Sequence, residues 1–204
     1  MIKLFRDPIY CLNTLILSIL WSTSAYAFYF TEFYMKYVPV SNIYYLALMM
    51  GVSDLITSMT FNLIYKKLTS KEIITISTLL LSCCGFVFAL VLYAKTDDKN
   101  DSLALEIFYT AMVFGMRFFS ALTFISVYFA NNEYFPTLLK GAIFAITNVA
   151  ARLASVMSPL IAEWMNNPSI TVAIVAFLAC LASVKLVKPI ETPPNKKSDL
   201  EAEK

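Results

Sequence analysis

Apolar stretches of about 20 residues recur along the 204-residue sequence, and they constrain the fold more than any other feature. An α-helix needs a stretch of roughly that length to cross the hydrocarbon core of a bilayer. Only 15% of the residues are charged, whereas a soluble domain carries about 25%. We therefore predict an all-α, polytopic membrane protein that is embedded in a lipid bilayer.

Short polar segments separate these stretches, as is usual for connections between neighbouring helices. We expect six transmembrane helices, at about residues 9–35, 42–65, 73–94, 103–130, 138–163 and 169–188. Together they would form one six-helix bundle over residues 1–188. The remaining segment, 189–204, is rich in proline and charge and is predicted to be a polar tail outside the membrane.

Basic residues are distributed unevenly between the two ends of the predicted bundle. Eleven lie at the end that carries both termini, and only Lys36, Lys95 and Lys99 lie at the other end. Because the inner side of a membrane protein carries an excess of lysine and arginine, both termini are predicted on the cytoplasmic or matrix side.

The third and sixth spans, 73–94 and 169–188, are free of charge until their ends. Helices that are apolar all round suit wide contact with lipid. Equivalent helices at positions three and six indicate two three-helix units, related as a 3+3 inverted repeat.

Composition also limits the function. The sequence has no histidine, and its four cysteines lie in or beside apolar stretches without a metal-binding spacing. Without a nucleophile constellation either, we expect no metal, no cofactor and no enzymatic activity. A net charge of +2, with no basic block interleaved with aromatics, argues against nucleic acid as a partner.

Three charged residues lie near the middle of apolar spans, namely Asp54, Arg117 and Arg152. Each lies roughly 18–21 Å from the start of its helix at 1.5 Å per residue, near the bilayer centre. A charge at this depth costs at least about 2.5–3.5 kcal/mol, which facing charges or a wet cavity would offset. With two arginines and one aspartate, the net charge near the bilayer centre would be positive, which favours an anionic ligand.

The first span adds polar and aromatic residues near this level. Ser22, Tyr26 and Tyr29 recur on one face, with Trp21 beside them. Aromatic walls around a cation would suit an amphipathic organic anion. In the alternative interpretation, Asp54 pairs with one arginine to join helices, and the aromatic residues serve packing or interface anchoring.

The turn before the fifth span suggests a latch between helix ends. Pro136 cannot extend the fourth helix but suits the first turn of the fifth. The turn lies on the basic inner side, within reach of the loop between the second and third spans. The candidate latch residues are Glu133, Pro136, Thr137, Lys140, Lys66 and Lys67. A solvated loop would have a similar composition.

Four stretches resemble the organic cation/anion transporter family of the major facilitator superfamily. They are SILWSTSAYAFYF (18–30), GMRFFSALTF (115–124), NNEYFPTLLKG (131–141) and VAARLASVMSP (149–159). The resemblance runs from about residue 5 to 190 and covers the family's C-terminal half, helices seven to twelve. It implies a central cavity for organic ions, with Arg117 and Arg152 facing an anionic substrate and Glu133 in an inner gate.

The sequence departs from this family in two respects. The segment 66–71, KKLTSK, stands where the family has D-R-x-G-R-[RK], so lysine replaces the acid and Thr69 replaces the glycine. This change alters the charge latch that would partner Glu133. The family's six N-terminal helices, which supply the second wall of the cavity, have no counterpart here.

Two functions are compatible with these observations. The first is a non-catalytic accessory or structural subunit of a larger membrane complex, derived from a transporter and suited to the mitochondrial inner membrane. The altered latch and the presence of only four glycines favour it. The alternative is a half-size organic-anion transporter that works as a homo- or heterodimer, for instance in the plasma membrane. The retained Arg117 and Arg152 favour this one.

Overall fold

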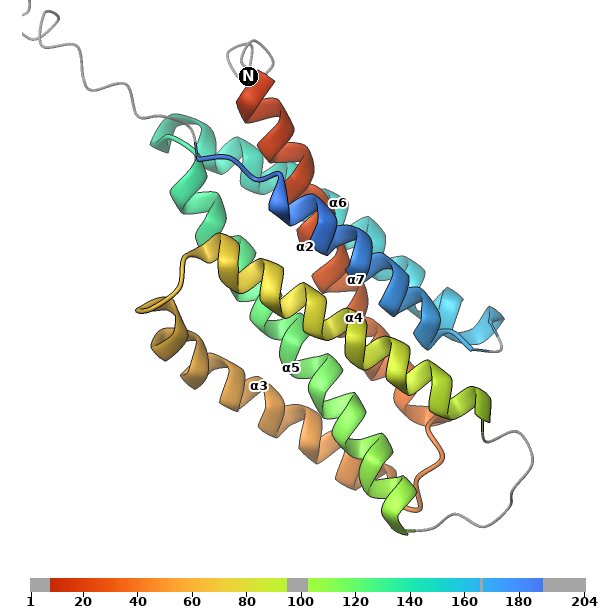
Figure 1. The fold of residues 1–204 in the computed structure, drawn as a ribbon. Coiled ribbons are helices and arrows are strands. Elements are labelled where there is room, and N and C mark those ends of the chain that lie inside the picture. The colour runs from red at the N-terminus through yellow and green to blue at the C-terminus, as the bar shows by residue number, and fades with distance from the viewer. Residues whose placement is uncertain (1–7, 95–102, 166, 189–204) are drawn as a thin grey trace, which may run out of the picture.

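The computed structural model describes residues 8–94, 103–165 and 167–188, and these residues form a bundle of helices (Figure 1). Within these ranges there are six α-helices, one short 3₁₀ helix and no strand. In chain order they are α2 (Pro8–Tyr34), η1 (Met35–Tyr37), α3 (Ile43–Tyr65), α4 (Ser70–Ala94), α5 (Leu103–Tyr134), α6 (Thr137–Trp164) and α7 (Ser169–Val184). The predicted all-α fold is confirmed.

Five of the helices, α2 to α6, are long and apolar enough to cross a membrane. The chain is therefore an integral membrane protein in contact with lipid. The predicted spans begin within three residues of the observed helices, although α5 continues to Tyr134 where an end at 130 was expected. The predicted tail at 189–204 and the loop lysines Lys95 and Lys99 lie outside the described residues.

The sixth span was predicted too long. Helix α7 has 16 residues and ends at Val184, and the chain from Leu186 to Lys188 is not helical. Backbone groups released from a helix within a bilayer must find other partners. Lys71 Nζ donates to the carbonyls of Val184 and Leu186, at 2.8 Å each.

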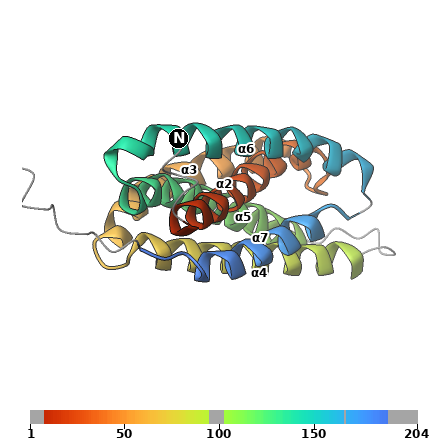
Figure 2. The same cartoon turned by 90° about the horizontal axis from the view of Figure 1, so that it is seen from above.

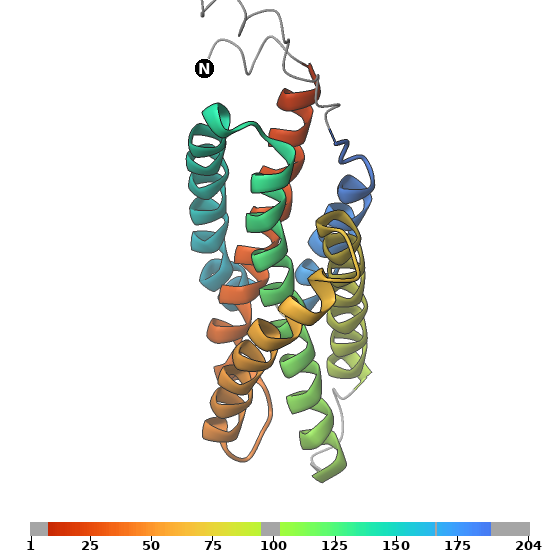
Figure 3. The same cartoon turned by 90° about the vertical axis from the view of Figure 1, so that its left-hand side faces the viewer.

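The end of this segment lies beside the start of α2. Asn13 Nδ2 donates to the Val187 carbonyl at 2.8 Å, and the Val187 amide donates to Asn13 Oδ1 at 3.3 Å. The two ends of the described chain consequently meet at one end of the bundle (Figure 3). The assignment of this end to the cytoplasmic or matrix side remains a prediction.

The helices are arranged in three layers, with α2 and α5 in the middle (Figures 2 and 3). One outer layer consists of α4 and α7, which pack against each other, with α4 also on α5 and α7 also on α2. In the other outer layer, α3 packs on α5 and α6 packs on α2. If α2, α3 and α4 are exchanged with α5, α6 and α7, respectively, the same pairs of packed helices result. Two three-helix repeats related by a two-fold axis have this property.

The α4–α7 layer is closely packed. A Cβ atom added at Gly85 would lie 3.1 Å from the backbone nitrogen of Ala173. Ser82 Oγ donates to the Ala173 carbonyl at 2.8 Å, so the two backbones also share a polar contact. Small residues that allow such an approach are a common means of joining helices in membranes. These two helices are thus not apolar surfaces facing lipid on every side.

Helices α3 and α6 form the outer layer with more exposed surface, and we call the face of the bundle that they occupy the open side. In the most apolar 18-residue segment of α3, only 22% of the residues are buried, and the same share is buried in α6. In the corresponding segment of α4, 44% of the residues are buried. The largest exposed faces therefore belong to the second and fifth spans, not to the third and sixth as predicted. Their most exposed apolar side chains include Tyr44, Tyr45, Leu48, Leu55, Met59, Leu63, Leu138, Val149, Leu153, Val156 and Trp164.

Candidate functional site

Arg117 of α5 and Asp54 of α3 form a bidentate ion pair on the open side. Arg117 Nε lies 2.9 Å from Asp54 Oδ1, and its Nη2 atom lies 2.8 Å from Oδ2. The arginine is nearly buried, with 5% of its surface exposed. Two parallel hydrogen bonds match the planar guanidinium to the carboxylate, which makes the pair both strong and directional. This pair joins α3 to the middle layer.

Two residues of α2 also contact the guanidinium of Arg117. Glu32 Oε1 lies 3.0 Å from Nη2, and the Phe28 carbonyl accepts a hydrogen bond of 2.9 Å from Nη1. The Phe28 ring also lies beneath the guanidinium, with Cζ 3.2 Å from its centroid. Arg117 therefore connects α2, α3 and α5, and its charge is already balanced by the carboxylates of Asp54 and Glu32.

Glu32 is the residue that the sequence analysis missed. It lies inside the first predicted span, at 9–35, and a carboxylate in such a span is a signal that could have identified it. With Glu32 included, the cluster around Arg117 contains two carboxylates and one cation. The prediction of a net positive charge near the bilayer centre is therefore wrong for the cluster around Arg117.

Arg152 of α6 does not join the cluster. Its side chain is exposed, and its Nη1 atom lies 3.3 Å from the hydroxyl oxygen of Tyr29. Within the described residues it forms no ion pair. The expectation that the three charged residues face one another thus fails for Arg152, because α3 and α6 pack on different central helices.

A cavity of about 280 Å³ lies beside the ion pair, between α2, α3 and α5. Phe28, Tyr29, Asp54, Ser58 and Phe124 contribute to its walls. Tyr29 therefore has two roles, since its ring lines this cavity and its hydroxyl contacts Arg152. The cavity and Arg152 together give the open side an aromatic surface next to an unneutralised cation.

The other aromatic and polar residues predicted for the site lie elsewhere. Trp21 is buried and packs edge-on against Phe124 and Phe144. Tyr26 is buried, and its hydroxyl is hydrogen-bonded to Thr171. Trp21 and Tyr26 therefore act as packing residues, as the alternative interpretation expected.

Ser22 and Tyr26 line a separate cavity of about 460 Å³ between α2, α6 and α7. Its walls are mostly apolar, and they include Ala154 and Met157. The prediction that Ser22, Tyr26 and Tyr29 share one site is thus not met. Ser22 and Tyr26 border α6 and α7, whereas Tyr29, less than one turn beyond Tyr26, lines the cavity beside α3 and α5.

The turn between α5 and α6 forms as predicted. Pro136 is the residue before the first turn of α6, and Thr137 begins that helix. Asn131 in the last turn of α5 donates to the Lys140 carbonyl at 3.5 Å, which ties the two helix ends together.

The latch at this end has different partners from those predicted. Glu133 accepts a hydrogen bond from the hydroxyl of Tyr65 and lies 3.8 Å from Lys188 Nζ. Neither Lys66 nor Lys67 contacts Glu133 among the residues that the structure describes. The acid therefore links the ends of α3, α5 and the segment after α7 through a neutral hydroxyl and a distant lysine.

Charged and aromatic side chains therefore lie next to each other at this site. Arg152, which has no ion-pair partner in the described part of the chain, and the aromatic cavity can hold an ion, whereas Arg117 is already paired with Asp54 and Glu32. Within the described ranges, no group of three His, Cys, Asp or Glu residues is placed to hold a metal ion.

The fold and the site thus define a helical integral membrane protein with charged groups in its spans. The chain is similar to organic anion transporter 3 of the rabbit, Oryctolagus cuniculus, at 27% identity over 207 residues. The aligned region covers 97% of this chain and 35% of the relative, so the chain spans about a third of that protein's length. No family model matches the sequence. This distant similarity supports a membrane protein derived from a transporter.

Proposed function

We propose that the chain is one half of an organic-anion transporter and binds the anion at Arg152 and Tyr29 on its open side. In this proposal the chain corresponds to the C-terminal half of a major facilitator fold and works with a second helical bundle. The observation that carries it is the exposed Arg152, which has no ion-pair partner among the described residues. A guanidinium in a membrane span needs a counter-charge, and here that charge must come from outside the described chain.

The surroundings of Arg152 determine what kind of anion would fit. Arg152 offers several donors and Tyr29 a hydroxyl, which together can bind a carboxylate. The rings of Phe28, Tyr29 and Phe124 line the adjacent cavity and suit an apolar, aromatic body. Asp54 and Glu32 are held by Arg117. The substrate class is therefore an amphipathic organic anion, in agreement with the name of the similar rabbit protein.

The open side also supplies the surface for a second bundle. Large apolar side chains of α3 and α6 are exposed on both flanks of the site, for example Leu55 and Leu153. A second bundle against this side would cover them and provide the opposite wall of the cavity. Rocking of the two bundles would then expose the anion to either side in turn.

Binding and transport can be tested separately on the purified full chain. Radiolabelled benzoate, an aromatic carboxylate, should bind to the chain in lipid nanodiscs and be taken up saturably by liposomes that contain it. Arg152→Gln should weaken binding at least about tenfold, as expected for the loss of a charged hydrogen bond. Arg152→Lys should retain part of the affinity, because it keeps the charge but loses the forked geometry.

Lys66→Gln is the matched control, since it removes one positive charge that contacts no described residue of the latch. It should leave benzoate binding unchanged. If Arg152→Gln binds benzoate as well as the wild type, the anion site is wrongly placed. Binding without uptake would assign translocation to an assembly larger than this chain.

A second candidate function is a non-catalytic accessory subunit of a membrane complex, with the mitochondrial inner membrane as a suitable location. The altered latch supports it, because Lys66 and Lys67 do not engage Glu133 among the described residues. In that case an acidic residue of another subunit would neutralise Arg152. Mild solubilisation of the native membrane should then release the chain within a large complex, and Arg152→Gln should weaken that association without any binding of benzoate.

A further inference from the structure

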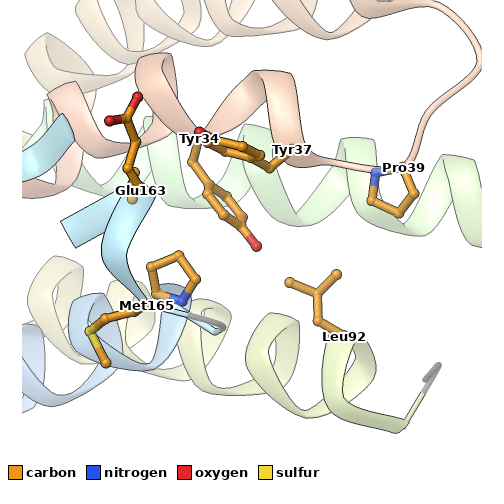
Figure 4. A pocket seen from close by; sticks show the side chains of 8 residues that line it. Tyr34, Tyr37, Pro39, Leu92, Glu163 and Met165 are labelled. Atoms are coloured by element: carbon orange, nitrogen blue, oxygen red, sulfur yellow. The ribbon is translucent and has the colours of Figure 1, made fainter. Parts of the chain in front are cut away.

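A third cavity, of about 410 Å³, lies at the opposite end of the bundle from the two described chain ends. It is formed where η1 and the α2–α3 connection come close to the ends of α4 and α6 and the start of α7. Its walls include Tyr34, Tyr37, Pro39, Leu92, Met165 and Pro168 (Figure 4). Four separate parts of the chain therefore meet around one space.

The hydroxyl of Tyr34 is the distinctive polar group of this cavity. The side chain lies at the end of α2 with only 7% of the residue's surface exposed. Figure 4 shows its hydroxyl pointing into the space between Met165 and Leu92. It has no hydrogen-bond partner within the described part of the chain. Because the hydroxyl faces this space, it can donate a hydrogen bond to a bound molecule or accept one from it.

The walls favour a flat aromatic molecule. The rings of Tyr34 and Tyr37 lie 5.9 Å apart and are tilted by 40°, and Pro39 and Pro168 present flat apolar surfaces. Met165 adds a polarizable thioether, which makes favourable contacts with aromatic rings. A cavity of about 150 Å³ suffices for benzene, so this larger one accommodates a ring with substituents.

The charges at the rim favour a neutral molecule. Lys36 Nζ lies 3.1 Å from Glu163 Oε1 and 4.6 Å from the centroid of the Tyr37 ring. These two charged groups therefore neutralise each other. A charged ligand would find Lys36 and Glu163 already paired with each other, whereas a hydroxyl needs only one hydrogen bond there.

We infer that this cavity binds a small neutral aromatic molecule with a phenolic hydroxyl, which pairs with the hydroxyl of Tyr34. Both hydroxyls can donate and accept, so the pair is satisfied in either direction. The ring lies among Tyr37, Met165 and Leu92. The inference does not depend on the anion site at Arg152, which is formed by different residues.

The test uses 4-methylphenol as the probe and the methyl NMR signal of Met165 as a local reporter. The full chain is labelled with methyl-¹³C methionine in nanodiscs, and the Met165 signal is assigned with Met165→Leu. Adding 4-methylphenol should shift this signal saturably, because an aromatic ring changes the local field. Tyr34→Phe should weaken binding of 4-methylphenol by about 2–10-fold and leave binding of toluene unchanged.

Ala162→Phe fills the cavity and should abolish the shift with either probe. Ala111→Phe, at an exposed position on α5, is the matched control and should retain it. Should Ala162→Phe fail to fold, the conservative Tyr34→Phe variant still decides the matter. Equal affinity of the wild type and Tyr34→Phe for 4-methylphenol would overturn the inference. Tighter binding of benzoate or benzylammonium than of 4-methylphenol at Met165 would overturn it as well.

Discussion

The helices of the two outer layers are held in place in different ways. Helices α4 and α7 approach so closely that Gly85 leaves no room for a side chain against Ala173. On the other side, α3 is attached to α5 mainly through the Asp54–Arg117 pair and five buried side chains. In lipid, helices associate through close packing or through polar contacts. Close backbone packing distinguishes the α4–α7 layer, and a bidentate ion pair distinguishes the attachment of α3 to α5.

This difference bears on where a partner or a ligand could act. The closely packed α4–α7 layer is completed within the chain itself. The α3–α6 side combines a saturated ion-pair cluster with an exposed cation, Arg152, and a wide apolar surface. Substitutions can therefore separate the residues that hold the bundle together from those that are available to a ligand.

The largest effect is expected from Arg117→Gln. The substitution leaves Asp54 and Glu32 as two carboxylates in a membrane span without a cation. We expect the free energy of unfolding to fall by about 3 kcal/mol, the lower part of the range for broken buried pairs, because both carboxylates are partly exposed. Unfolding with sodium dodecyl sulfate in mixed micelles measures this change. Arg117→Lys should recover only part of it, and a loss below about 1 kcal/mol would show that α3 is held by other contacts.

Asp54→Asn should have the next largest effect. Asp54 accepts two hydrogen bonds from Arg117, whereas Glu32 contacts only Nη2. We expect a loss of about 2 kcal/mol for Asp54→Asn and less than about 1 kcal/mol for Glu32→Gln, from the usual strength of charged hydrogen bonds and exposed pairs. The same detergent titration compares the two variants. Equal losses would mean that the two acids share the cation equally.

Two glycine substitutions compare the two outer layers directly. Gly85→Ala should lower the free energy of unfolding by roughly 1–2 kcal/mol, because the new methyl group forces the α4 and α7 backbones apart. Gly51→Ala, on α3, meets no atom within 4 Å and should be neutral or stabilising by up to about 1 kcal/mol through helix propensity. Parallel unfolding titrations test the difference in sign. Similar losses at both positions would contradict the contrast between a packed and an open side.

The smallest change in stability is expected for Arg152→Gln. Its one described contact is a 3.3 Å approach to the Tyr29 hydroxyl, and the side chain is exposed. The free energy of unfolding should change by less than about 0.5 kcal/mol, as for most surface substitutions. A well-folded variant that no longer binds benzoate would separate the role of Arg152 from that of Arg117. A large loss of stability would instead make Arg152 part of the framework.

Much of the fold could be predicted because it follows from local sequence. The lengths of the apolar stretches locate the helices, and Pro136 locates the turn between α5 and α6. Asp54, Arg117 and Arg152 stand out as costly charges in apolar spans. These features depend on the bilayer as solvent and on the chemistry of single residues.

The partners of these charged residues depended on the tertiary structure. In a bilayer both the lipid-facing and the protein-facing sides of a helix are apolar, so the sequence pattern says little about how a helix is rotated. For this reason sequence alone could not place Glu32 on Arg117 or leave Arg152 beside Tyr29. The apolar length and the intramembrane charges were determined by the sequence. Lateral packing decided which arginine is neutralised and which remains available.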